Sequence, residues 1–169
     1  MTQIRTDRLL LRKARESDLA PLHAIFSDPE TMRYWSTPPH ADLETTRCWL
    51  AAMIDLPAST GDDYIVELDG RVIGKLGLWQ ASEIGFLLSR DTWGQGLGRE
   101  ALSAFVAHAF RERADHLTAD VDPGNAACLA LLKRVGFRET GRATRTWTVG
   151  DQWCDSVYLR LDRDRPRPT

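Results

Sequence analysis

The chain has 169 residues, a formal net charge of −2 and a hydrophobic content of 43%. This length suits one domain with a substantial core, and the near-neutral charge gives no indication of a nucleic-acid partner. Cys48, Cys128 and Cys154 lack the spacing of metal ligands, which favours a reducing compartment over a disulfide framework. No apolar run approaches membrane-spanning length and the first residues lack the regions of a signal peptide, so we expect a soluble cytoplasmic protein without a membrane partner.

The N-terminal third predicts one strand followed by helices. Residues 9–13 are short and apolar, as in a strand, and residues 17–26 begin with a serine suited to cap a helix. Residues 28–34 begin with an acid followed by proline, which predicts a second, short helix. The prolines of residues 35–40 predict a loop, and residues 42–54 return to a helical pattern.

The middle of the chain predicts a hairpin, a strand and a long helix. Asp-Gly at residues 69–70, between the apolar runs 62–68 and 71–79, is a strong signal for a two-residue hairpin turn. Residues 81–88 form the next strand. Apolar residues then recur at helical period through residues 96–112, which predicts a helix with one apolar stripe.

The C-terminal part predicts a strand at 117–121, a helix at 125–135 and a closing hairpin of residues 137–149 and 153–161. Residues 163–169 are charged and contain proline, so we expect a disordered tail. This order of strands and helices, with antiparallel pairing at the centre and the end, favours an α+β domain over a doubly wound sheet.

The most informative stretch is W-G-Q-G-L-G-R-E-A at residues 93–101, between a predicted strand and a predicted helix. A glycine-rich turn that opens a helix leaves several backbone N–H groups directed at one point, and the helix dipole reinforces them. Side chains at Gly94, Gly96 or Gly98 would keep a phosphate away from this backbone. The stretch therefore predicts an anion site suited to a diphosphate, or else only a tight turn.

Two common nucleotide motifs are excluded by spacing. The dinucleotide fingerprint needs a glycine where this chain has Arg99. Residues 70–76, G-R-V-I-G-K-L, are too short for a Walker A loop and end in leucine.

A second segment, N-A-A-C-L-A-L-L-K-R-V-G-F at residues 125–137, has an N-cap, a helical apolar pattern and a C-terminal glycine. Together with residues 93–101 it resembles the two acyl-CoA-binding segments of the GNAT N-acetyltransferase superfamily. The opening T-D-R-L-L-L-R at residues 6–12, followed by E-S-D-L at 16–19, is similar to the start of the RimJ/RimL-like branch. The resemblance extends from about residue 6 to residue 161.

The resemblance implies one acyl-CoA N-acyltransferase domain over residues 1–162, with a mixed, mostly antiparallel sheet of six or seven strands flanked by helices. The fourth and fifth strands would splay apart, and the pantetheine arm of acetyl-CoA would enter the gap. It would pair with three peptide groups, the loop would hold the pyrophosphate, and an asparagine side chain would bind pantetheine. These residues are, in turn, Phe86, Leu87 and Leu88; Gly94, Gln95, Gly96, Leu97, Gly98 and Arg99; and Asn125.

Acetyl transfer to an amine needs a neutral amine, a polarised thioester carbonyl and a proton for the leaving thiolate. Asp120, at the end of its predicted strand, matches a position where some members carry a glutamate base. Glu83, at the start of the strand implied to pair with pantetheine, is the alternative. Either carboxylate can instead be a solvated side chain at a strand end.

The proton donor to the thiolate is a separate question. Leu132 stands where many members have a proton-donating tyrosine, and Cys128 stands where this branch often has serine. Because a thiol in the first turn of a helix can have a lowered pKa, we hypothesise that Cys128 contacts or protonates the CoA thiolate, without an acetyl-cysteine intermediate. The alternative is a small buried packing residue.

The loops at 34–40 and 149–153 are expected to build the acceptor pocket. Trp35, Trp147 and Trp153 are then either its aromatic lining or core residues. His40, within the first of these loops, is either a secondary base or an ordinary exposed histidine.

The leading hypothesis is an N-acetyltransferase that works by direct attack in a ternary complex, with acetyl-CoA as co-substrate. The acceptor is a primary amine, either a protein N-terminus or a small molecule such as an amino acid, polyamine or drug, and the sequence does not choose between them. A hypothesis from another class is a non-catalytic acyl-CoA-binding module that senses the cofactor or regulates a partner. A third is a structural domain that uses the turn only for folding. The sequence leaves a homodimer open.

Overall fold

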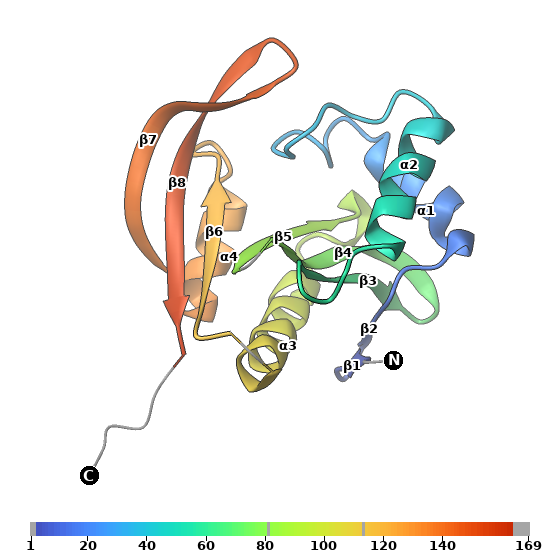
Figure 1. Ribbon diagram of the computed structural model, residues 1–169, viewed down its shortest axis with the longest axis horizontal. Helices are drawn as coiled ribbons and strands as arrows, with labels where there is room; N and C mark the ends of the chain where they lie inside the picture. The colour runs from blue at the N-terminus through green and yellow to red at the C-terminus, as the bar shows by residue number, and fades with distance from the viewer. Residues whose placement is uncertain (1–2, 81, 113, 164–169) are drawn as a thin grey trace.

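The computed structural model describes residues 3–80, 82–112 and 114–163, so the tail expected to be disordered lies outside it from residue 164 on. One eight-stranded sheet runs in the order β1-β2-β3-β4-β5-β6-β8-β7, with helices on both faces (Figure 1). The strands are β1 (Ile4–Arg5), β2 (Leu9–Arg12), β3 (Asp62–Leu68), β4 (Arg71–Gln80), β5 (Glu83–Leu88), β6 (His116–Val121), β7 (Arg138–Val149) and β8 (Gln152–Asp162). The helices are η1 (Glu16–Asp18), α1 (Leu19–Phe26), α2 (Leu43–Ile54), η2 (Arg90–Thr92), α3 (Leu97–Glu112) and α4 (Ala126–Val135), of which η1 and η2 are 3-10 turns.

Local backbone signals set several of these elements. Asp69 and Gly70 both have positive φ, 51° and 78°, as the predicted two-residue turn between β3 and β4 requires. Asn125 caps α4 by accepting the N–H of Cys128 at 3.2 Å. Gly136, with φ of 113°, ends the same helix in the left-handed conformation. The predicted hairpin of β3 and β4 and the predicted helix α4 are therefore confirmed.

Successive side chains of β3 point to opposite faces of the sheet, and the hydrophobic core accordingly has two parts, one on each face. Tyr64 and Val66 belong to the cluster formed with α3 and α4, whereas Ile65 belongs to the cluster formed with α1 and α2. Helices α1 and α2 thus cover one face of the sheet, and α3 and α4 cover the other. In the part of the chain that is described, no helix is both long and apolar enough to span a membrane.

The sheet opens between β5 and β6. These parallel neighbours share one registered pair, Glu83 with Thr118, and Thr118 N–H donates to the carbonyl of Ser82 at 2.8 Å. Beyond this pair, no residue described in the two strands has a further registered partner across the gap, so they diverge toward their C-terminal ends (Figure 1). This is the predicted splay. The α+β fold is confirmed, with one strand more than expected because the two-residue β1 pairs with β2.

The helix predicted for residues 28–34 is wrong. The capping geometry exists, since the carboxylate of Asp28 accepts the N–H of Thr31 at 3.0 Å and its hydroxyl at 2.5 Å. The chain then continues as successive turns, because the following prolines restrict the backbone and His40 N–H is bonded back to the carbonyl of Phe26 at 2.8 Å.

Ser17 is not the cap of the first helix. It lies inside η1, and α1 begins only at Leu19. The stabilising side chain is Asp18, whose carboxylate accepts the N–H of Arg15 at 2.7 Å and forms a buried ion pair with Arg12. A carboxylate that has both partners fixes this turn more firmly than a serine hydroxyl does.

Candidate active site

The glycine-rich loop lies where β5 leads through η2 into α3. Gly94 and Gly96 have φ of 74° and 76°, a backbone conformation that residues other than glycine rarely adopt. Gly98 serves close packing instead, because a Cβ there would lie 3.2 Å from Leu131 Cδ2. The loop is thus shaped to expose backbone N–H groups at the N-terminus of a sixteen-residue helix.

The edge of β5 that faces the gap is defined by its ladder with β4. Ser89 N–H donates to the carbonyl of Ile73 at 2.7 Å, and Leu87 is registered with Lys75. In an antiparallel ladder hydrogen-bonded and non-bonded pairs alternate. Since Ser89 and Ile73 form a bonded pair, Leu87 and Lys75, two positions further on, form the next one and exchange both hydrogen bonds. The peptide groups of Phe86 and Leu88 therefore point toward the gap, and the pairing with pantetheine implied for Leu87 is taken by β4.

Trp93 joins the loop to the end of β5. Its indole Nε1 donates to the carbonyl of Leu88 at 2.8 Å, while half of its surface is exposed. Leu88 thus has a partner for its carbonyl within the protein, and its N–H and the peptide groups of Phe86 are the groups directed at the gap. Sequence reasoning gave Trp93 no role of this kind.

Asn125 and Cys128 lie at the start of α4. Asn125 Oδ1 accepts the cap bond from Cys128 N–H, and Nδ2 is left to donate to a ligand such as pantetheine. Burial raises the pKa of Cys128 to about 12, which contradicts the lowered pKa expected at a helix N-terminus. A thiol with that pKa is a poor proton donor to a thiolate whose ordinary pKa is about 8.5, and Cys128 packs against the core.

Asp120 lies on β6, on the face of the sheet opposite α3 and α4, since its neighbours Ala119 and Val121 belong to the core beneath those helices. Ser156 Oγ of β8 donates to Asp120 Oδ2 at 2.9 Å. Burial raises the pKa of Asp120, and this hydrogen bond partly opposes the effect. Glu83 shares this face by the alternation of β5, with the amide of Gln80 3.4 Å from its carboxylate.

Behind Ser156 stands a second hydroxyl. Thr146 Oγ1 lies 2.7 Å from Ser156 Oγ and 3.2 Å from the carbonyl of Cys154. Because Ser156 donates its one proton to Asp120, only Thr146 can donate in the contact between the two hydroxyls, and it shares its one proton between Ser156 and the carbonyl of Cys154. Sequence reasoning missed both hydroxyls, since their contact with Asp120 depends on the register of β6 with β8.

A bulge in β7 brings Thr146 into this position. Ala143 is paired with Ser156 and Trp147 with Cys154, so three residues of β7 oppose one residue of β8. Within the bulge, Arg145 has φ of 52° and its N–H donates to the carboxylate of Asp155 at 2.9 Å. Bulges commonly redirect side chains beside active sites.

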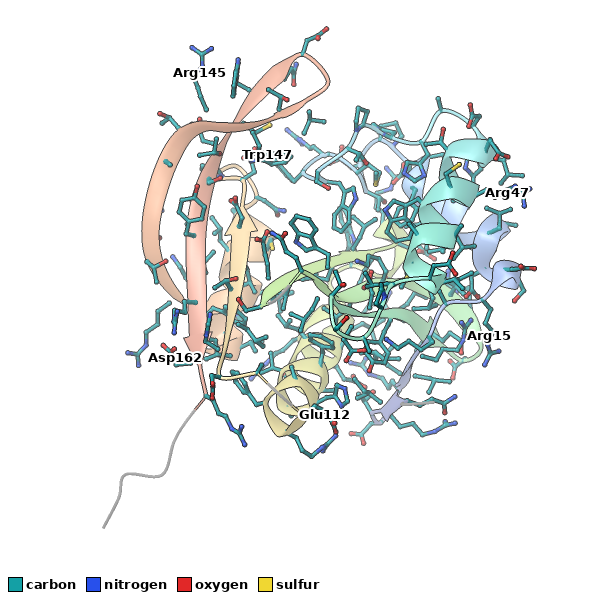
Figure 2. The ribbon with its side chains drawn as sticks, viewed as in Figure 1. Arg15, Arg47, Glu112, Arg145, Trp147 and Asp162 are labelled. Atoms are coloured by element: carbon teal, nitrogen blue, oxygen red, sulfur yellow. The ribbon has the colours of Figure 1, made fainter. Side chains whose placement is uncertain are left out.

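The bulge also separates the tryptophans of the hairpin. Figure 2 shows Trp147 on the inner side of the hairpin, toward the segment between α1 and α2, and Arg145 on the outer side. The guanidinium of Arg145 lies 5.0 Å from the ring centre of Trp153, which is 55% exposed. Trp147 thus lies on the inner side of the hairpin, whereas Trp153 is exposed and packs against Arg145.

The loop between α1 and α2 approaches the same face from the other side. A Cβ added at Gly85 of β5 would lie 3.6 Å from the ring of Trp35, and one at Gly124 would lie 3.3 Å from the ring of Tyr34. The aromatic residues of this loop therefore cover the centre of β5 and reach the turn after β6. Aromatic side chains therefore lie on the loop side, at Trp35 and Tyr34, and on the hairpin side, at Trp147.

His40 is not an exposed loop histidine and is not placed to act as a base. It is buried, its ring centre lies 5.0 Å from that of Phe26, and its Nδ1 lies 2.9 Å from Thr46 Oγ1. Burial lowers its pKa, and nearby His23, bonded to the same hydroxyl at 2.8 Å, adds to the effect. Over the described ranges, no three His, Cys, Asp or Glu side chains gather as a metal site.

Residues 8–138 match the family described as the acetyltransferase (GNAT) domain. The chain therefore belongs to the GNAT family, whose members are acyltransferases that use acetyl-CoA. It is 29% identical over 151 residues to the uncharacterized N-acetyltransferase p20 of Bacillus licheniformis, covering 83% of this chain and 85% of that one. It is also 29% identical to the L-methionine sulfoximine/L-methionine sulfone acetyltransferase of Pseudomonas aeruginosa, over 93% and 96% of the two chains.

The fold has close counterparts among solved structures. RimL, the ribosomal L7/L12 alpha-N-protein acetyltransferase, in complex with coenzyme A superposes with a TM-score of 0.85 at 19% identity, over 95% of this chain and 98% of that one. At 19% sequence identity the similarity to RimL is evidence for the fold alone. The predicted GNAT resemblance and the use of acetyl-CoA are confirmed.

Proposed function

We propose that this protein acetylates the primary amine of a small, amino acid-like acceptor by direct attack on acetyl-CoA in a ternary complex. The observation that carries the proposal is the carboxylate of Asp120, held through one oxygen by Ser156 on the open face beside the divergence of β5 and β6. The loop at Gly94 and Gly96 would bind the diphosphate, and the edge of β5 would bind pantetheine.

Asp120 is assigned the role of general base. An amine with a pKa near 10 is mostly protonated at neutral pH and cannot attack until it loses a proton. Asp120 takes that proton, directly or through one water, on the oxygen that Ser156 does not occupy. Burial raises the pKa of Asp120, and a raised pKa makes a carboxylate a stronger base. Glu83, at the start of β5, is the alternative base.

The amine nitrogen then forms its bond to the thioester carbon, and the carbon–sulfur bond breaks with its electron pair on sulfur. The nitrogen loses its second proton to water, and the thiolate takes up a proton from water after it leaves. The CoA thiolate has an ordinary pKa of about 8.5, so it leaves without an obligatory acid. Leu132 has no proton to give, and the raised pKa of Cys128 makes it a poor donor. We assign Cys128 to packing beside the cofactor.

The acceptor class rests on the space around Asp120. Trp35 and Tyr34 lie on one side and Trp147 on the other, and aromatic side chains on both sides suit the apolar part of a small amine. The Pseudomonas relative, which is similar over nearly the whole chain, is named for acetylation of amino acid analogues. A protein N-terminal amine, as in RimL, is the competing acceptor.

The test is an acceptor screen. The protein is incubated with acetyl-CoA and single amines, namely amino acids, methionine sulfoximine, a polyamine and peptides with a free N-terminus, and the released CoA thiol is measured. We expect turnover with one or more amino acid-like amines. Turnover confined to peptides would replace the acceptor class, and binding of acetyl-CoA without turnover of any amine would overturn the proposal in favour of a sensor.

A further inference from the structure

The turn between β1 and β2 packs against the first turn of α3. Arg8 Nε and Nη2 lie 2.7 and 2.6 Å from Glu100 Oε2, and the backbone N–H of Arg8 donates to Glu100 Oε1 at 3.0 Å. Thr6 Oγ1 donates to the same Oε1 at 2.5 Å. Burial alone would raise the pKa of Glu100, but the bonds from Thr6 and Arg8 outweigh it and hold this pKa below its ordinary value. Glu100 is therefore ionised at neutral pH.

The same guanidinium reaches into the glycine-rich loop. Arg8 Nη1 donates to the carbonyl of Gln95 at 3.1 Å, and Nη2 would lie 3.7 Å from a Cβ at Gly96. The carbonyl and the N–H of one planar trans peptide point in opposite directions. By holding the Gln95 carbonyl, Arg8 turns the N–H of Gly96 to the opposite side, away from the β1–β2 turn.

Charge gives Arg8 a second effect on the loop. Glu100 lies in the first turn of α3, where its carboxylate interacts favourably with the helix dipole. The same carboxylate would repel a diphosphate bound at this helix end. Arg8 compensates the charge through a fork of two nitrogens, which a lysine cannot reproduce.

We propose that Arg8 is a positioning residue for the diphosphate of CoA, because it orients the Gln95–Gly96 peptide and neutralises Glu100. The proposal rests on the placement of the diphosphate at the loop in the proposed function. It concerns binding of the cofactor and is independent of which amine is acetylated. Arg8 is assigned no direct contact with the reacting atoms.

The experiment measures the dissociation constants of CoA and of pantetheine, which lacks the diphosphate, by calorimetry. The variants are Arg8→Gln, Arg8→Lys, Glu100→Gln and the double variant Arg8→Gln/Glu100→Gln. Arg142→Gln is the matched control, since Arg142 makes a similar two-nitrogen contact with Glu139, at 2.6 and 3.1 Å, on β7. Thermal unfolding of each variant reports whether it is folded.

We expect Arg8→Gln to weaken CoA binding by about tenfold or more, to leave pantetheine binding unchanged, and to raise KM for acetyl-CoA more than it lowers kcat. Glu100→Gln in the Arg8→Gln background should restore part of the affinity, and Arg8→Lys should retain part of it. Equal losses for CoA and pantetheine, or CoA binding as tight as in the parent, would overturn the role of Arg8. A parent protein that binds CoA but acetylates no amine would instead overturn the proposed function and leave this binding result intact.

Discussion

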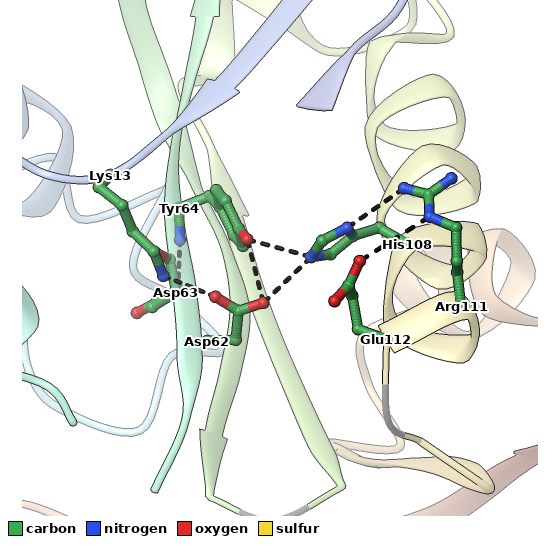
Figure 3. A network of polar contacts seen from close by, with 7 residues as sticks. All are labelled: Lys13, Asp62, Asp63, Tyr64, His108, Arg111 and Glu112. Atoms are coloured by element: carbon green, nitrogen blue, oxygen red, sulfur yellow. Dashed lines mark hydrogen bonds and ion pairs between the residues drawn. The ribbon is translucent and has the colours of Figure 1, made fainter. Parts of the chain in front are cut away.

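Asp62 on β3 and Asp120 on β6 each have a carboxylate that accepts a hydrogen bond from a hydroxyl, but they differ in how many of their oxygens have a partner. Asp62 Oδ1 binds Lys13 Nζ at 2.6 Å, while Oδ2 accepts from the hydroxyl of Tyr64 at 3.0 Å and lies 3.3 Å from His108 Nε2 (Figure 3). Both oxygens of Asp62 are therefore engaged by the protein itself.

The network around Asp62 continues to the end of α3. His108 is buried, its Nε2 lies 3.1 Å from the hydroxyl of Tyr64, and its Nδ1 lies 3.4 Å from Arg111 Nη2 (Figure 3). Both ring nitrogens thus have partners. An aspartate, a tyrosine and a histidine in contact look like catalytic groups, but here they join β3 to α3.

Asp120 differs because only one of its two carboxylate oxygens has a hydrogen-bond partner among the described residues. Among the bonds of the described residues, those to its carboxylate involve Oδ2 alone, through Ser156 and behind it Thr146. No bond to Oδ1 is found among the described residues, and the side chain lies on the face of the sheet opposite α3 and α4. Partners on every polar atom mark a structural cluster, whereas a carboxylate held on one oxygen beside an open strand edge is suited to move a proton.

Neutralising each carboxylate in turn should give the largest difference between the two sites. Asp120→Asn should lower kcat by about 100-fold or more, the contribution of a general base, with binding of acetyl-CoA retained. Asp62→Asn, the matched control, should lower the free energy of unfolding and leave kcat unchanged. Steady-state kinetics and urea unfolding measure both effects. A fully active Asp120→Asn variant would transfer the role of base to Glu83.

Glycines extend the comparison to the backbone. Gly94→Ala at the loop and Gly70→Ala at the β3–β4 turn place the same methyl group at φ of 74° and 78°, with no atom within 4 Å of either Cβ. The strain is about 1–2 kcal/mol at each position. At Gly94 it should weaken CoA binding by about 5- to 30-fold, whereas Gly70→Ala should cost stability only. Calorimetry with CoA distinguishes them, and equal affinities for CoA would argue against the loop as the diphosphate site.

Removing the hydroxyl of Tyr64 tests the structural network. Tyr64→Phe takes a partner from Asp62 and from His108 and should lower the free energy of unfolding by about 1–3 kcal/mol. Affinity for CoA and kcat should not change. Denaturant unfolding and steady-state kinetics give the two values. Lost activity in a folded variant would mean that the network reaches the active site.

Removing the hydroxyl that holds Asp120 tests the other carboxylate through pH. The base acts when ionised, so kcat/KM falls as the pH is lowered through the pKa of Asp120, which burial raises. Ser156 stabilises the ionised form, so Ser156→Ala should raise this pKa further and move the acid limb of the pH profile to higher pH. Well above the limb, variant and parent should converge. Ser103→Ala, at an exposed site on α3, should leave the profile in place, and an unmoved limb in Ser156→Ala would refute the positioning role.

The smallest expected effect is that of Cys128→Ala. Because burial raises the pKa of this thiol to about 12, it should not supply the proton of the leaving thiolate. We expect unchanged kcat and a modest loss of stability from the missing packing contact. A large drop in kcat, with acetyl-CoA still bound, would restore the catalytic hypothesis for Cys128.

Much of the fold was predictable because its signals are local. The turn at Asp69–Gly70, the cap at Asn125 and the apolar stripe of α3 depend on residues a few positions apart, and each formed as predicted. The helix predicted from Asp28 failed although its cap formed. One capped turn does not make a helix when the following chain is held elsewhere, here by the bond from His40 to Phe26.

The family and the glycine-rich loop could be read from the sequence alone, because they depend on residue types at fixed spacing along the chain, and the resemblance to the family then implied Asp120 as a candidate base. Tertiary structure alone decided what surrounds them. Arg8 meets Glu100 across 92 positions and Ser156 meets Asp120 across 36, so these contacts follow from strand register and helix packing. Hydrogen bonds need a separation of about 3 Å and charge effects are screened beyond about 10 Å, and only the folded chain brings such distant residues that close.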